Sequence, residues 1–434
     1  MAEHLEGAAS KECDHWHDDA GILTHHMAFT LELEQSLQTI DSSVAMPYWD
    51  YTADAYFLGK DKFHLSPIFK DDWFGPLSPA NADHVIDTGR WAYTSVSKVA
   101  SASAGLPESF TRIKNAYGLL RSPWNLNPTP YLTRFQEVLG VEFGGFSLPT
   151  CSDFKSAYAH EKLGYLFSEL NGLLHGPIHI VIGGQWHWDQ EKYNITKLVH
   201  DVHLDQAAGF FLLSSKFLWR QGFLRCPEYC SADTSAEACS CSCPSAVTEG
   251  RKPWDLLRKT GLSYLDNGWM RDGFLDETDM DFTDLWDLLC HIGHVGEMFT
   301  SAAPYDPTFW PLHGLAERFL TLKRLMAHAG KTSLIEEWTY THETTLASDT
   351  HVVCDWSNVT GMERPSCTPG TCPGHHKDDL LPMGNFLSNN ETYTNWEFYE
   401  FTSPFNHELP YVYDSFTVWP GCDAQNISFS DLTR

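Results

Sequence analysis

The stretch HHMAFTLELEQSL, residues 25–37, has the polar and apolar spacing of an amphipathic helix. Apolar Phe29, Leu33 and Leu37 recur every four residues, and glutamates and glutamines occupy positions between them. His26 stands at the head of this apolar stripe, so we expect its imidazole to face the interior. The stretch therefore predicts a helix that carries a histidine into the core.

Other histidines occur at spacings that suit a metal site. His17 precedes His26 by nine residues, and His313 ends the run DPTFWPLH. His175 and His179 stand four apart in LLHGPIHIVIGG, so on a helix they share one face and can reach one ion. Neutral imidazole suits copper. These histidines are therefore candidate metal ligands.

Prolines indicate where the helices around these histidines begin. Residues 161–182 are helical in pattern, but Pro177 is tolerated only in a first turn, so we expect a helix start near Leu174. Asp306 followed by a proline has the form of an N-cap and first turn. Pro311, deeper in that segment, predicts a local kink.

Five motifs follow one another in a fixed order along the chain. They are a histidine pair nine apart with a later glutamate, a Pro-Tyr-Trp-Asp stretch, His-x-x-x-His before Gly-Gly, Asp-Pro-x-Phe before a histidine and an acid-Arg pair, and Tyr-x-Tyr. Their residues are His17, His26 and Glu34; Pro47, Tyr48, Trp49 and Asp50; His175, His179, Gly183 and Gly184; Asp306, Pro307, Phe309, His313, Glu317 and Arg318; and Tyr411 and Tyr413. The set resembles the tyrosinase, catechol oxidase and hemocyanin family of dinuclear copper proteins.

This resemblance implies a mainly α fold, in which a four-helix bundle holds two copper ions and is wrapped by long loops and a little β structure. It also implies one copper domain over residues 1–414, followed by a C-terminal tail over 415–434. Three histidines would hold each ion. The implied ligands are His4, His17 and His26 for the first copper, and His175, His179 and His313 for the second.

Some of these ligands have rivals. His4 is the weakest of the six, because His15 lies nearby and because the family usually has more residues before its first ligand. The N-terminus also has no apolar core of a signal peptide, so either the protein is intracellular or the natural chain begins earlier, and we expect the second. His291 and His294 in CHIGHVGEMF compete for the second site, but they stand three apart instead of four.

The resemblance implies oxidation of o-diphenols to o-quinones with dioxygen, so the expected partners are a small phenol and dioxygen. Hydroxylation of monophenols is less favoured, because Gly176 stands where the family often has an asparagine that helps to deprotonate them, and Ile180 is also apolar. The alternatives are an oxygen-binding protein like hemocyanin, without turnover, and a degenerate copper protein.

The remaining side chains of these motifs are expected to have structural roles. Phe309 should pack against the copper site and keep it dry. Glu317 and Arg318 are expected to form a buried charge pair that fixes the last helix.

Composition agrees with this interpretation. The chain has 434 residues, 42% of them hydrophobic, which is enough for a large core. Its net charge of −28 makes nucleic acids and anionic membranes unlikely partners. The sequence contains no apolar run long enough to span a bilayer. A small neutral phenol is little affected by the charge.

Twelve cysteines indicate an oxidising environment. Residues 185–290 separate the second-site histidine pair from the last ligand by far more than the family's usual few tens of residues, so we interpret them as an insertion. We expect disulfides there, although a structural metal knot is the alternative. Glycosylation sequons and the cysteines together predict a secreted protein or one in the secretory lumen. The insertion's cysteines are Cys226, Cys230, Cys239, Cys241 and Cys243, and the sequons begin at Asn194, Asn358, Asn390 and Asn426.

Overall fold

The protein is described by a computed structural model. The described residues are 4, 8, 16–17, 21–96, 129–142, 148–186, 195–204, 207, 218, 223–224, 241–243, 286, 288–337, 351–352, 365–366, 377–384, 391–409 and 413–429.

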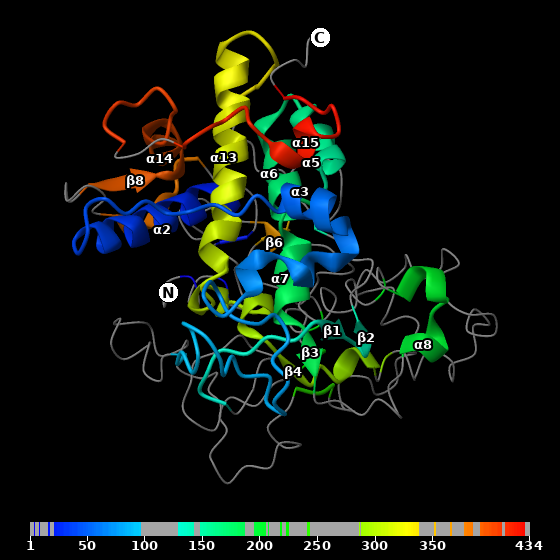
Figure 1. Cartoon of the computed structure of the whole chain (residues 1–434). Helices are drawn as coiled ribbons and strands as arrows, with labels where there is room; N and C mark the ends of the chain where they lie inside the picture. The colour runs from blue at the N-terminus through cyan, green and yellow to red at the C-terminus, as the bar shows by residue number, and fades with distance from the viewer. Residues whose placement is uncertain are drawn as a thin grey trace.

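Helices form the centre of the molecule. The longest, α13 (Phe309–His328), runs through the middle, with α2 (Gly21–Gln38) on one side and α6 (Leu163–Asn171) and α7 (Gly176–Gly183) on the other (Figure 1). Helix α2 contacts both α13 and α6. The other α-helices within the described residues are short: α3 (Tyr51–Asp54), α5 (Cys151–Tyr158), α8 (Ile195–Leu198), α14 (Asn395–Phe401) and α15 (Pro420–Asp423).

Strands are short and occur in pairs within the described part of the chain. Three pairs are antiparallel: β1 (Glu137–Val138) with β2 (Val141–Glu142), β3 (Gln185–Trp186) with β4 (His294–Val295), and β7 (Leu380–Gly384) with β8 (Thr392–Thr394). The pair β5 (His351–Val352) and β6 (Pro365–Ser366) is parallel. The prediction of a mainly α fold with a little β structure is confirmed.

Helix α2 confirms the amphipathic prediction only over its first turns. His26 and Phe29 are buried, but Leu37 is 37% exposed and Ile40 is 87% exposed. The helix ends at Gln38 and is followed by a turn, so the C-terminal part of the predicted apolar stripe lies outside the core. Glu34, on the predicted polar side, is fully buried, and the hydrogen bond that its carboxylate accepts from the Met46 N–H at 2.8 Å offsets part of the cost.

Both proline-marked helices begin later than predicted. Helix α7 starts at Gly176 with Pro177 in its first turn, as the sequence requires, and a break after α6 precedes it. Helix α13 starts at Phe309, not beside Asp306, because the Asp306 carboxylate accepts the N–H and Oγ of Thr308 ahead of the helix. Pro311 therefore falls in the first turn, and the helix continues to His328 without the predicted kink.

Two disulfides join described cysteines to each other. Cys243 bonds Cys290 within the predicted insertion, and Cys241 is also disulfide-bonded, which favours disulfides over a metal knot there. Cys226, Cys230 and Cys239 lie outside the described residues. Cys151 bonds Cys422 and joins α5 to α15. The division of the chain into residues 1–414 and a tail of 415–434 stays a prediction.

Replacing both Cys151 and Cys422 by serine is expected to destabilise the fold by about 2–5 kcal/mol. The bond closes a loop over a sequence separation of 271 residues, so its loss frees a long stretch of the unfolded chain. Thermal unfolding of the double variant measures this loss. An unchanged midpoint, with the disulfide shown intact in the wild type by mass spectrometry, would contradict the prediction.

No helix in the described part of the chain has the length and apolar character needed to cross a membrane.

Candidate metal centre

The structure brings the six predicted histidines together in two groups of three. His4, His17 and His26 form one group; His175, His179 and His313 form the other. Within each group, the atoms able to bind a metal all lie within 4.8 Å of one another. His15, the predicted rival of His4, lies outside the described residues.

The two groups face each other across the helices. The rings of His26, from α2, and His313, from α13, stack with centroids 4.3 Å apart and planes 6° apart. Phe309, one turn before His313, lies against both groups. Its ring centroid is 4.2 Å from that of His313 and 5.4 Å from that of His4. The prediction that Phe309 packs against the site is confirmed.

The alternative histidines lie elsewhere. His294 is on β4, where it pairs with Trp186 of β3, and their ring centroids are 6.1 Å apart. His291 precedes this strand on the same loop. Neither joins the two groups.

Backbone carbonyls orient three of the six rings. The carbonyls of Ser301 and Met298 each accept from a histidine Nδ1 at 2.8 Å, that of His4 and that of His179 respectively. The Leu170 carbonyl accepts from Nδ1 of His175. A ring that donates through Nδ1–H has its lone pair on Nε2, which is the arrangement that metal-binding histidines use.

Burial keeps the central histidines neutral. Loss of water, followed by repulsion from neighbouring histidines, lowers the pKa of His26 and His313 well below the usual value. Burial likewise lowers the pKa of His175 well below that value and the pKa of His179 to about 4. All four therefore have a free lone pair near neutral pH.

The donor set fits a metal ion of the copper type. Both ring nitrogens of His26 and Nε2 of His313 are buried without a hydrogen-bond partner among the described residues. Buried imidazoles in an ordinary core are normally hydrogen-bonded. These nitrogen atoms are instead suited to bind a metal cation. Clustered neutral imidazoles are the donors that copper and zinc prefer.

The glycine pair after His179 has a packing role. A side-chain carbon on Gly183 would meet the backbone of Phe299, and one on Gly184 would meet the backbone of Phe135. Gly184 also has φ of +64°, which favours glycine. The pair therefore lets two loops approach the end of α7.

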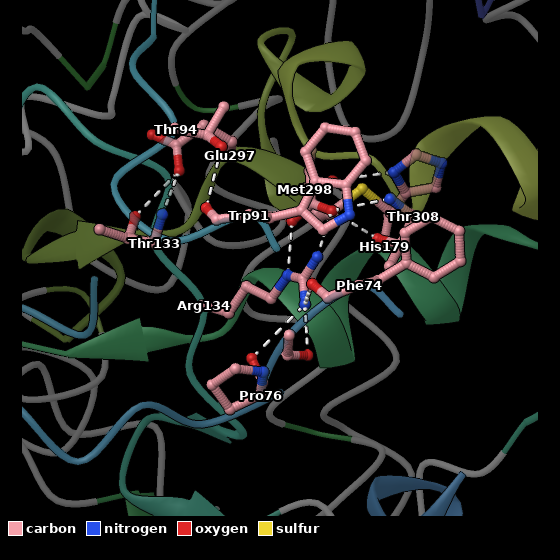
Figure 2. A network of polar contacts seen from close by, with 12 residues as sticks. Phe74, Pro76, Trp91, Thr94, Thr133, Arg134, His179, Glu297, Met298 and Thr308 are labelled. Atoms are coloured by element: carbon pink, nitrogen blue, oxygen red, sulfur yellow. Dashed lines mark hydrogen bonds and ion pairs between the residues drawn. The ribbon is translucent and has the colours of Figure 1, made fainter. Parts of the chain in front are cut away.

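A buried network beside the second group was not found from the sequence. Arg134 and Asp306 form a two-point ion pair at 2.7 Å, and both side chains are fully buried. Arg134 also donates to the carbonyls of Phe74 and Gly75 (Figure 2). Because Asp306 holds Thr308 at the N-terminal end of α13, the pair fixes the helix that carries His313.

Glu317 and Arg318 do not form the predicted charge pair. Arg318 donates to the carbonyls of Ser415 and Val418, both at 2.7 Å. Glu317 accepts from the Tyr413 hydroxyl at 3.2 Å. Neighbours on a helix point in different directions, so each residue ties α13 to a different part of the C-terminal segment. Tyr411, the other tyrosine of the motif, lies outside the described residues.

Burial raises the pKa of Glu317 to about 8, with a smaller contribution from Glu34, while the Tyr413 hydroxyl partly offsets it. A carboxyl in an unfolded chain has a pKa of about 4.3. Between these values the native state keeps a proton that the unfolded state has released, so stability falls as pH rises and levels off above about 8.

In the metal-free protein, Glu317→Gln is expected to flatten this pH dependence. Its stability relative to the wild type should rise from pH 4 to pH 8 by up to about 5 kcal/mol, at about 1.36 kcal/mol per pKa unit. Urea unfolding at several pH values measures the slope. A constant difference between the two proteins over this range would show that Glu317 titrates normally.

Comparison with known proteins gives one consistent result. Residues 2–193 match the family model for the common central domain of tyrosinase. The chain is 50% identical over 191 residues to a tyrosinase of Streptomyces antibioticus, covering 44% of this chain and 62% of that protein. A tyrosinase of Streptomyces glaucescens is 47% identical over 192 residues, covering 44% and 61%.

A third relative is covered more fully. The chain is 32% identical over 254 residues to a tyrosinase of Streptomyces lincolnensis, covering 56% of this chain and 78% of that protein. The chain thus spans less than two thirds of the first two relatives and more than two thirds of the third. With its two facing histidine groups, the chain belongs to the tyrosinase family.

Proposed function

We propose that this protein is a copper-dependent oxidoreductase that oxidises o-diphenols to o-quinones with dioxygen. The observation that carries the proposal is the pair of facing histidine groups, whose nearest rings stack with centroids 4.3 Å apart. Two diphenols would lose two electrons and two protons each, and one dioxygen would become two waters. The named relatives are tyrosinases, which supports this reaction class.

We assign the six histidines as ligands of two copper ions, with His4, His17 and His26 holding one and His175, His179 and His313 holding the other. Copper would supply the redox chemistry, passing electrons from the phenol to dioxygen. We further propose that α2, α6, α7 and α13 are the four helices of a bundle around the site. Helices α2, α7 and α13, with the N-cap residue of α7, provide four of the six ligands, and α6 packs against α2.

The chain's own side chains would prepare the site for this chemistry. Burial keeps the imidazoles neutral, so no proton has to leave before they bind a metal. Carbonyls hold three rings in the tautomer that presents Nε2. The Phe309 ring lies against both groups and excludes water between them.

We propose that diphenols are preferred over monophenols. Gly176, the first residue of α7, follows His175 and has no side chain to help remove a phenolic proton. Ile180, which follows His179, is apolar and buried. Diphenol oxidation needs no such group, because the diphenol already has both oxygens.

The test is to load the purified protein with copper and measure the metal content, oxygen uptake and quinone colour with a catechol. The proposal predicts close to two coppers per chain, and quinone formed with matching oxygen uptake. An oxygen-dependent near-ultraviolet band without quinone would instead indicate an oxygen carrier. A protein that holds no copper would remove the assignment of the site.

We also propose that the protein works in an oxidising compartment outside the cytosol. The two disulfides Cys151–Cys422 and Cys243–Cys290 support this, because such bonds persist where thiols are not kept reduced. Glycosylation stays a prediction; of the sequons, only Asn426 lies among the described residues, and it is exposed.

A further inference from the structure

One short turn of the chain offers a backbone carbonyl to each of the two histidine groups. The turn spans residues 296–301 and contains the one-turn 3-10 helix η7 (Glu297–Phe299). The Met298 carbonyl accepts from His179 Nδ1 in one group, and the Ser301 carbonyl accepts from His4 Nδ1 in the other, both at 2.8 Å. A shift of this turn would therefore rotate a ring in both groups.

Glu297 anchors the turn at its N-terminal end. Its side chain is fully buried, and Oε2 accepts two hydrogen bonds from Thr133, from the N–H at 2.7 Å and from Oγ1 at 3.0 Å (Figure 2). Two donors from one residue fix the direction of the carboxylate. The Glu297 carbonyl also accepts the Thr300 N–H at 2.8 Å, which closes the turn.

The same turn packs closely against α7, the helix that carries His179, through backbone contacts. The Gly296 N–H donates to the Gly183 carbonyl at 3.1 Å. A side-chain carbon on Gly296 would meet the Thr133 carbonyl at 2.6 Å, and one on Gly183 would meet Phe299. The turn thus lies between α7 and the segment of Thr133, with glycines at the contacts, and Glu297 holds it to that segment.

We propose that Glu297 is a positioning residue for both metal sites, acting through the turn that fixes the Nδ1 atoms of His179 and His4. Glu297 bonds Thr133 and belongs to neither histidine group, so its effect on bound metal is indirect. The inference rests on the proposed function only in requiring that the two histidine groups bind copper.

The experiment measures how fast bound copper leaves the protein for a coloured chelator. Glu297→Ala removes the acceptor of both Thr133 bonds and is expected to accelerate release from both sites by about 10- to 100-fold, the usual loss for an outer partner of a metal-binding histidine. Thr133→Val removes one of the two bonds and should give a smaller acceleration. Glu297→Gln keeps an acceptor oxygen and should restore most of the retention.

A matched control exists on α14. Thr394 donates its N–H at 2.8 Å and its Oγ1 at 3.0 Å to Oε2 of Glu397, nearly the same geometry, but at an exposed helix cap. Glu397→Ala should leave copper release unchanged. Phe398→Leu, a change in a fully buried residue of the same helix, reports what general destabilisation does to release.

The outcomes separate this inference from the proposed function. A wild-type protein that binds no copper would overturn the proposed function, and the inference with it. A wild type with two coppers and a Glu297→Ala variant that releases them at the wild-type rate would overturn the inference alone. The inference would also be overturned if Phe398→Leu, at the same thermal stability as Glu297→Ala, released copper equally fast. The same holds if Glu297→Gln released copper as fast as Glu297→Ala.

Discussion

His313→Ala is expected to abolish diphenol oxidation and to leave the protein with about one copper per chain. His313 is 3% exposed, and its ring lies close to those of His26, His175 and Phe309. Alanine is the best helix former, so α13 should persist while its ligand is lost. Copper affinity of the second site should fall by more than about 100-fold, beyond the loss typical of an outer partner.

The matched control for this prediction is His328→Ala, the same substitution in the last turn of the same helix. His328 is exposed and packs against Phe405, with ring centroids 4.3 Å apart. This variant should keep two coppers and full turnover with a catechol. Retained turnover in His313→Ala, measured as quinone formed per copper, would remove the assignment of the second site.

Asp306→Asn is expected to destabilise the protein by about 3–5 kcal/mol, because it leaves the buried Arg134 guanidinium without its counter-ion. The pair is fully buried on both sides, with two bonds of 2.7 Å. Water cannot reach the arginine to compensate.

Urea unfolding of the metal-free protein measures this loss. Glu336→Gln is the comparison: Glu336 is 39% exposed and lies 3.7 Å from the 7% exposed Arg324, so its replacement should cost less than that of the fully buried Asp306. Combining Asp306→Asn with Arg134→Met should cost less than the two single changes added together. Equal effects of Asp306→Asn and Glu336→Gln would show that the fully buried pair contributes no more than a partly exposed pair.

The sequence placed six histidines among its candidate ligands, and the structure brings them into two groups of three. His179 lies on α7 and His175 is the N-cap residue just before it, while an apolar stripe turns His26 inward on α2. The grouping of the histidines in space could not be predicted in the same way, because no helical spacing or apolar pattern places His4 beside His17. That association was predicted only through the resemblance to a family.

The supporting residues could not be predicted in this way. Thr133, Arg134 and Glu297 are single polar residues with no periodic pattern, and their partners lie far away in the chain. The start of α13 also differed from the prediction, because the Asp306 carboxylate accepts hydrogen bonds from both Arg134 and Thr308. The predicted ion pair of Glu317 and Arg318 rested only on their being adjacent in the sequence. On a helix, adjacent side chains point in different directions and contact different neighbours.

The bond between Cys151 and Cys422 has a consequence for a nicked molecule. Both α7 and α13, with the second group of histidines, lie between the two sulfurs in the chain. A protease that cuts once anywhere in this interval yields two pieces that stay covalently joined. On a denaturing gel such a cleaved form would migrate as a single band until a reductant is added. The two fragments that carry the histidine groups would stay linked through the disulfide.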